Sequence, residues 1–173
     1  MRILIFNWRD LRHKWAGGAE AYIHEMAKGW VARGHQVTVF CGNDGENQRH
    51  QFIDGVHIVR RGGFYMVYVW ALLYYIVRFR GLYDVVIDSE NGIPFFTPFY
   101  SRKPKFLLVH HIHQEVFTRY LRFPLSKIAT FLETKVMPFI YRNEKIVTVS
   151  RSSREDILKI LGKGGNSFLA ECG

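Results

Sequence analysis

Hydrophobic and polar positions divide the start of the chain into three predicted elements. The apolar run at residues 2–7, RILIFN, leaves no room for a helix and leads into polar residues, which predicts a buried parallel strand. From Ala19 to Val31, apolar residues recur at steps of three and four, which predicts an amphipathic helix that Gly34 ends. The valine-rich run at residues 35–42 predicts a second strand. This order predicts a right-handed βαβ unit.

The same kind of pattern continues along the chain. Residues 51–61 predict a hairpin that turns at Asp54-Gly55. Residues 91–104 carry three of the five prolines, so we expect an irregular crossing with at most a short helix. Three further buried strands are predicted at residues 84–88, 105–111 and 145–150.

Two helices are predicted in the last third of the chain. One runs over residues 126–142, with a kink at Pro138. The other begins at a capping box formed by Ser152 and Glu155. The alternation of strands and helices predicts a three-layer α/β domain with a mainly parallel sheet.

The segment at residues 64–77, FYMVYVWALLYYIV, consists of uncharged apolar and aromatic residues. A helix that spans a membrane needs about 20 such residues, so this segment is too short. Its length predicts a buried helix packed on the sheet. The alternative is a helix lying in a membrane interface, because Arg78 and Arg80 follow its tyrosines and its tryptophan.

Composition sets limits on the class of protein. With 173 residues, 48% of them hydrophobic, the chain can bury the core of one domain. Two cysteines, Cys41 and Cys172, are too few for a disulfide framework, which favours a reducing compartment. The apolar run at the start is too short for a secretory signal, so we expect a cytoplasmic protein.

Positive charge favours anionic partners. The net charge is +9, with a pI near 9.7, and the basic residues are spread along the chain. A phosphate-bearing substrate, an anionic membrane face and nucleic acid would each suit this charge, as would a merely solvated basic surface. No helix-turn-helix, RNP-type or zinc motif accompanies the charge, so nucleic acid is not expected.

Polar residues follow several of the predicted strands. Ligands of open parallel sheets bind beyond the carboxyl ends of the strands, so these residues are the candidates for a site. In chain order they are Asn7 and Trp8, the turn AGGAE, then Asp88, Ser89, Glu90 and Asn91, then His110, His111 and His113, and last Ser150 and Arg151.

The turn that contains Gly17 and Gly18 has two interpretations. The backbone amides at the positive end of the following helix would attract a phosphate or another anion. Alternatively, the glycines form a tight turn and Glu20 favours the first helical turn through the helix dipole. Neither a GxGxxG fingerprint after the first strand nor a GxxxxGK[ST] loop is present.

Three histidines fall within four positions, at His110, His111 and His113. In an extended chain, His111 and His113 would share one face, as a metal pair does. No third ligand is evident in the sequence, so a hydrogen-bonding or acid/base role is favoured, and a purely structural role for at least one of the three is the alternative. Asp88 and Glu90 are either turn residues or carboxylates that orient a substrate hydroxyl.

Five stretches, taken in order, resemble the amino-terminal domain of family 4 glycosyltransferases, which have the GT-B fold. They are RILIFN, GGAEAYIHEMAKGWVARGHQVTVFCG, DVVIDSENGIPFFTPFY, FLLVHHIHQEVF and KIVTVSRSSREDI. The resemblance implies a Rossmann-like domain over residues 1–162, which is one half of a GT-B fold. It also implies retaining transfer of a sugar, of the hexosyl type, from a nucleotide-sugar donor to an acceptor hydroxyl.

The resemblance implies roles for particular residues. Gly17 and Gly18 match glycines that face the donor diphosphate, and His110, or His111 at an offset of one, matches the histidine beside the transferred sugar. Candidate acceptor contacts are Asn7, Glu90, Asn91, His113 and Arg151. The nucleotide-sugar is a substrate, so no cofactor and no metal are expected.

Family members continue into a second domain that holds the nucleotide, whereas residues 163–173 are expected to form a short tail. The isolated chain is therefore expected to be inactive, and it would be peripheral on the inner face of a membrane if it binds one. The alternatives are a nucleotide-binding domain of another enzyme class, or a basic module that binds membranes or nucleic acid.

Overall fold

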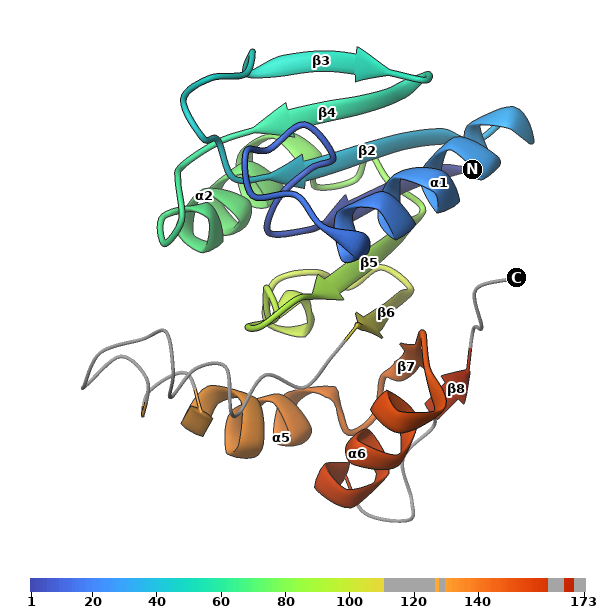
Figure 1. The fold of residues 1–173 in the computed structure, drawn as a ribbon, viewed down its shortest axis with the longest axis vertical. Coiled ribbons are helices and arrows are strands. Elements are labelled where there is room, and N and C mark those ends of the chain that lie inside the picture. Colours follow the sequence, from blue (N-terminus) through green and yellow to red (C-terminus); the bar gives the residue numbers. More distant parts are fainter. Residues whose placement is uncertain (111–126, 128–129, 162–166, 170–173) are drawn as a thin grey trace.

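An eight-stranded sheet forms the centre of the molecule, in the order β3-β4-β2-β1-β5-β6-β7-β8 (Figure 1). The computed structural model describes residues 1–110, 127, 130–161 and 167–169. All neighbouring strands are parallel except β3 and β4. The predicted α/β class with a mainly parallel sheet is therefore confirmed.

The first half of the chain follows the predicted order closely. Asp54 and Gly55 both have positive φ, 49° and 79°, and pair Ile53 with Val56, so the hairpin turns where predicted. The elements are β1 (Arg2–Phe6), α1 (Gly18–Ala32), β2 (Gln36–Cys41), β3 (His50–Ile53), β4 (Val56–Arg60), α2 (Val67–Tyr74) and the π-helix η1 (Tyr75–Phe79).

In the second half, the segment at residues 91–104 contains only a short 3-10 helix, as expected. A π-helical turn directly precedes the helix that contains Pro138, so the predicted long helix is interrupted near the proline, which has no amide hydrogen to donate. The elements are β5 (Val85–Glu90), η2 (Thr97–Phe99), β6 (Lys105–Val109), η3 (Leu132–Val136), α5 (Met137–Tyr141), β7 (Lys145–Thr148), α6 (Arg151–Leu161) and β8 (Ser167–Leu169).

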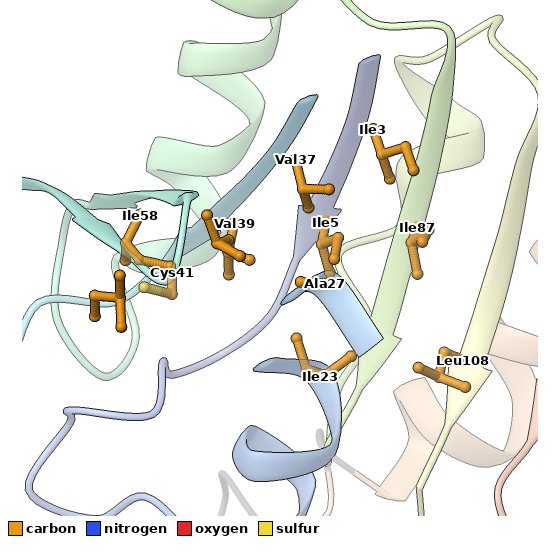
Figure 2. Close-up of a cluster of buried hydrophobic side chains, with 12 residues drawn as sticks. Ile3, Ile5, Ile23, Ala27, Val37, Val39, Cys41, Ile58, Ile87 and Leu108 are labelled. Atoms are coloured by element: carbon orange, nitrogen blue, oxygen red, sulfur yellow. The ribbon is translucent and has the colours of Figure 1, made fainter. Parts of the chain in front are cut away.

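Helices cover the two faces of the sheet with separate clusters of apolar side chains. On one face, Ile23 and Ala27 of α1 lie against Ile3, Ile5 and other strand residues (Figure 2). On the other face, Val67 and Ala71 of α2 pack in a cluster that includes Leu4 and Phe6. Because successive strand residues point to opposite faces, β1 contributes to both clusters, which explains its continuous apolar run.

The start of α6 differs from the prediction. The hydroxyl Oγ of Ser150 accepts a hydrogen bond from the amide of Ser153 at 3.1 Å. Ser150 therefore caps the helix, and the capping box proposed at Ser152 and Glu155 is wrong by two residues. Three of the four residues from 150 to 153 are serines, so the sequence alone does not identify the cap. The end of β7 at Thr148 determines that Ser150 takes this position.

The sheet continues past the expected domain boundary at residue 162. Strand β8 lies within residues 163–173, the segment expected to be a tail, and pairs in parallel with β7 through Val147 and Phe168. Part of that segment therefore belongs to the domain. A three-residue strand carries too weak an apolar pattern to be recognised from the sequence alone.

The segment at residues 64–77 is only half buried. Val67, Ala71, Tyr75 and Phe79 face the sheet, but the large side chains between them are exposed. The prediction of a buried helix is right for one face and wrong for the other. Within the described ranges, no helix is both long enough and apolar enough to cross a membrane.

Candidate functional site

Two neighbouring cavities lie at the carboxyl ends of the parallel strands, and Arg9 lines both of them. The larger, of about 420 Å³, is called the glycine cavity here and is lined by Arg9, Gly17, Gly18, Ala19, Glu20, Tyr22, Asn91, His110 and Val149. The smaller, of about 180 Å³, is called the aromatic cavity and is lined by Trp8, Arg9, His13, Lys14, Trp15, Gly42, Asn43, Asp44, Gly63 and Phe64.

Glu20 organises the first turn of α1. Its Oε2 accepts a hydrogen bond from the amide of Gly17 at 2.7 Å, and its Oε1 accepts from Arg9 Nε at 3.1 Å and Asn91 Nδ2 at 3.0 Å. The side chain is fully buried. The carboxylate thus partly compensates both the positive end of the helix and the guanidinium.

Gly18 leaves space at the start of α1. A Cβ atom added to Gly18 would meet nothing within 4 Å, and one added to Gly17 would make only an ordinary contact with Glu20 Oε2 at 3.6 Å. No described residue accepts a hydrogen bond from the amide of Gly18. Packing does not require either glycine, so an external group is free to approach the backbone here.

His110 is fixed at the end of β6 from several sides. Its Nε2 lies 3.2 Å from Ser89 Oγ, and its ring meets that of Tyr22 edge-on with centroids 5.6 Å apart. Its carbonyl oxygen accepts a hydrogen bond from Ser153 Oγ at 2.9 Å. A buried imidazole held in this way can exchange hydrogen bonds with a hydroxyl in the glycine cavity without having to reorganise.

The aromatic cavity is built from the loops that follow three strands. Trp8 Nε1 donates to the carbonyl of Phe64 at 3.0 Å, and the two rings pack edge to face at 4.5 Å. Trp15 is 54% exposed, and Lys14 lies over its ring. Burial lowers the pKa of His13, so this ring is neutral near pH 7. Aromatic faces with a few polar groups suit a ligand that has both apolar and hydroxylated surfaces.

A buried carboxylate stabilises the loop beside the site. Asp88, in β5, accepts hydrogen bonds from the amides of Phe95 and Thr97, at 2.8 and 3.1 Å, and from the hydroxyl of Tyr141. Burial raises the pKa of Asp88 despite these hydrogen bonds. Of the two roles considered for Asp88, the structure shows the turn role, because the carboxylate holds the turn at Phe96, whose φ is 54°.

The predicted site residues fall into three groups. Gly17, Gly18, Asn91 and His110 line the glycine cavity together. Asn7 and Glu90 are fully buried and line neither cavity, and Arg151 is exposed at the first turn of α6. His111 and His113 lie outside the described residues.

Several residues that line the cavities were not among the sequence-based candidates, and they include Arg9, Trp15 and Phe64. Arg9 and Trp15 lie in the polar loop after β1, where no periodic pattern marks them. The only available signal was their position between a strand end and a helix start. The sequence pattern assigned Phe64 to a buried helix, so its position in the aromatic cavity was not predicted.

A metal site among these residues has no support from the described part of the chain, which contains no group of three or more His, Cys, Asp or Glu side chains arranged to hold an ion. The pair suggested by the sequence, His111 and His113, is outside that part. The charged groups that reach the glycine cavity are instead Arg9 and Glu20.

Known proteins resemble the chain in sequence and in fold. The model of the family described as Glycosyltransferase Family 4 matches residues 16–165. The structure resembles sucrose-phosphate synthase from Thermosynechococcus elongatus, with a TM-score of 0.73 at 13% identity, over 99% of this chain and 48% of that chain. A shorter chain of the same enzyme gives a TM-score of 0.66 at 11% identity, over 100% of this chain and 90% of that chain.

At these identities, the structural likeness establishes the fold alone. The chain spans about half the length of the first sucrose-phosphate synthase chain. No curated protein sequence matches the chain significantly.

Proposed function

Since this chain belongs to glycosyltransferase family 4 and has the Rossmann-like fold of one half of a GT-B enzyme, we propose that it is the acceptor-side half of a retaining glycosyltransferase. The reaction would move a hexosyl group from a nucleotide-sugar to an acceptor hydroxyl. The observation that carries this assignment is the pair of adjoining cavities at the carboxyl edge of the sheet, which share Arg9.

The glycine cavity is assigned to the donor diphosphate. The amide of Gly18 lies at the positive end of a 15-residue helix and has open space in front of it. Arg9 adds a permanent positive charge, which Glu20 partly offsets. A site of this kind holds a diphosphate without a metal, although only weakly, because the other side of the phosphates would have to be held by a second domain.

We assign His110 to the sugar that is transferred. It borders the same cavity as Gly18, and Ser89 and Tyr22 limit the rotation of its ring. A hydrogen bond from this residue to a sugar hydroxyl would orient the ring of the donor for attack by the acceptor.

The aromatic cavity is assigned to the acceptor. Trp8, Trp15 and Phe64 offer aromatic faces, on which the apolar face of a sugar ring packs well. Because Arg9 lines both cavities, an acceptor held here would lie next to a donor bound in the glycine cavity.

One experiment tests the assignment of the glycine cavity. The chain is titrated with a nucleoside diphosphate, and binding is followed by isothermal calorimetry and by tryptophan emission. Gly18→Ala should weaken diphosphate binding by about tenfold, since the methyl group occupies the approach to the amide. Gly29→Ala is the matched control, because it also adds a methyl group to α1 in open space but lies far from either cavity.

Equal diphosphate affinity in the two glycine variants would reject the phosphate assignment. Tighter binding of NAD than of nucleoside diphosphates would favour an oxidoreductase domain instead. The 173 residues alone should transfer no sugar, because about half of the sucrose-phosphate synthase chain has no counterpart in them. Turnover of any nucleotide-sugar by the purified chain would disprove that expectation.

A further inference from the structure

The stretch from Tyr65 to Phe79, which contains α2 and η1 and is called the α2 segment here, has an exposed side that is apolar or aromatic from Tyr65 to Val77. Its buried side already packs on the sheet through Val67, Ala71, Tyr75 and Phe79. A helix on the surface of a soluble protein normally turns a polar face to water, and this one does not. The side chains that define this face, called the α2 face here, are Tyr65, Met66, Val69, Trp70, Leu72, Leu73, Ile76 and Val77, with exposures between 38% and 72%.

Arginines flank the α2 face in the sequence, and no acidic residue lies between them in the chain. From Arg61 to Tyr83 the sequence contains no Asp or Glu, whereas it contains Arg61, Arg78 and Arg80. Within the part of the chain that the structure describes, neither Arg78 nor Arg80 forms an ion pair. The face therefore combines exposed apolar surface with uncompensated positive charge.

A third cavity adjoins the α2 face. It measures about 530 Å³ and is lined by Asn43, Gly45, Arg49, Arg60, Arg61, Gly62, Trp70 and Tyr74. Trp70 belongs to both the cavity and the α2 face. Arg60 forms an ion pair with Asp10. The guanidinium of Arg61 has no carboxylate partner among the described residues and instead contacts the Tyr74 hydroxyl, His50 and the carbonyls of Arg49 and Arg60. Arg49 is exposed. The cavity thus offers two arginines, Arg49 and Arg61, beside an aromatic ring.

We propose that the α2 face lies in the interfacial region of an anionic membrane, with Arg49 and Arg61 binding the phosphate of a lipid head group beside Trp70. Apolar side chains would enter the boundary between head groups and acyl chains, where tryptophan and tyrosine are favoured. Arg78 and Arg80 would add attraction to the negative surface.

The dimensions of the segment agree with this orientation. The 8 residues of α2 and the 5 of η1 extend over roughly 20 Å, because a helix rises about 1.5 Å per residue. This is less than the hydrocarbon thickness of about 30 Å, so the segment lies along the membrane surface and does not cross it. A second copy of the chain is a poorer occupant, because a symmetric contact would bring the arginines of both copies together.

Phe64 connects the α2 face to the aromatic cavity. It lines that cavity, is 39% exposed and directly precedes Tyr65 of the face. Membrane docking would therefore place the aromatic cavity close to the lipid surface. The docking itself does not depend on the proposed transferase function.

Vesicle flotation tests the proposal. The chain is mixed with vesicles of phosphatidylcholine alone, or of phosphatidylcholine with about one third phosphatidylglycerol. Flotation with the anionic vesicles only, accompanied by a blue shift of tryptophan emission, is expected. Replacing Arg78 and Arg80 with Ala should lower the partition coefficient about fivefold per arginine, and added salt should weaken binding of the wild type.

Two variants distinguish vesicle binding through the α2 face from nonspecific adsorption of exposed apolar side chains. Leu73→Glu combined with Val77→Glu places two charges on the face and should abolish flotation. Phe99→Glu is the control, because Phe99 is 73% exposed but lies in η2, outside the α2 segment, and its variant should float like the wild type. Far-ultraviolet circular dichroism and melting curves establish that each variant is folded.

Three results would overturn the proposal. The first is the absence of flotation with anionic vesicles. The second is equal flotation of the Leu73→Glu/Val77→Glu variant and the wild type. The third is a dimer in analytical ultracentrifugation that this double variant dissociates, without vesicle binding by the wild type, which would identify the α2 face as a protein interface.

Discussion

Asp10 and Arg60, fifty residues apart in the chain, form a buried bidentate ion pair, with Arg60 Nε donating to Asp10 Oδ1 at 2.8 Å and Nη2 donating to Oδ2 at 2.6 Å. The two residues are 4% and 1% exposed. The pair ties the loop after β1, which carries Arg9 and leads to Gly18, to the last residue of β4. The position of both cavities therefore depends on a contact between distant segments.

Arg60→Ala should lower the free energy of unfolding by about 3–5 kcal/mol, because it leaves the carboxylate of Asp10 buried without its cation. Arg2→Ala is the control, since Arg2 pairs with Asp84 on the surface, with side-chain exposures of 47% and 40%. The Arg2→Ala substitution should lower the free energy of unfolding by no more than about 1 kcal/mol. Urea denaturation measures both, and equal losses would show that the Arg60 pair contributes no more than a surface pair.

Gly62→Ala should destabilise the turn that leads into α2. Gly62 has φ +70°, and an added Cβ would lie 2.7 Å from the backbone of Met66 and Val67. Backbone cannot move aside at low cost, so a loss of about 2–3 kcal/mol is expected. At Gly63, the nearest atom is 3.9 Å away, so Gly63→Ala should change stability by less than about 0.5 kcal/mol. Thermal melting of the two variants gives the comparison.

Gly18→Ala should leave the fold intact. The site has open space, and φ of Gly18 is not positive, so alanine fits at the first position of α1 and favours the helix. The free energy of unfolding should stay the same or rise by up to about 1 kcal/mol. A loss of stability in denaturant titrations would mean that the glycine serves the turn and not a ligand.

The stability of the protein should depend on the protonation of Asp88. Burial raises the pKa of this carboxyl group above its ordinary 3.8, so the folded state holds the proton more tightly than the unfolded state. The resulting contribution is complete below pH 3.8 and is lost as the pH rises through the folded-state pKa. Asp88→Asn lacks this contribution at every pH.

The difference in the free energy of unfolding between wild type and Asp88→Asn should therefore be largest at low pH and shrink as the pH rises. Other carboxyl groups titrate in both proteins and cancel in the difference. Urea titrations between about pH 3 and pH 7 measure it. A difference that grows with pH would show that the ionised carboxylate is the form that the folded protein favours.

Cys41 should be inert in the native protein. It is fully buried in β2, and burial raises the pKa of its thiol well above the ordinary value, so the reactive thiolate is scarce. In a Cys172→Ser variant, labelling with a disulfide reagent should be at least about 1,000-fold slower than in denaturant, because it requires unfolding. Rapid labelling would reveal a local opening at the end of β2.

The fold was largely readable from the sequence, because it depends on local patterns. The hairpin turn at Asp54-Gly55, the end of α1 near Gly34 and the order of strands and helices each follow from residues within a few positions of one another. The errors arose where a local pattern fitted several positions, as with the cap of α6 at Ser150, or where the pattern was too short, as with β8.

The candidate site was only partly readable. The rule that ligands bind after the carboxyl ends of parallel strands correctly predicted that Gly18, Asn91 and His110 lie together, since all three line the glycine cavity. The same rule also selected Asn7 and Glu90, which are buried, because it cannot tell which side of a strand end faces solvent. No sequence pattern marked Arg9 and Trp15. They lie in a loop, and a loop has no hydrophobic periodicity from which the direction of its side chains can be predicted.

The sequence by itself determined the α/β class and most of the elements, because hydrophobic period and turn chemistry act over a few residues, and the family was indicated by its resemblance to family 4 glycosyltransferases. Only the tertiary structure decided that Glu20 meets Asn91 across 71 residues, that Asp10 meets Arg60, and that the α2 segment leaves one apolar face exposed. These features depend on how strands distant in the chain are ordered in the sheet and on what packs against each helix, and local patterns do not contain that information.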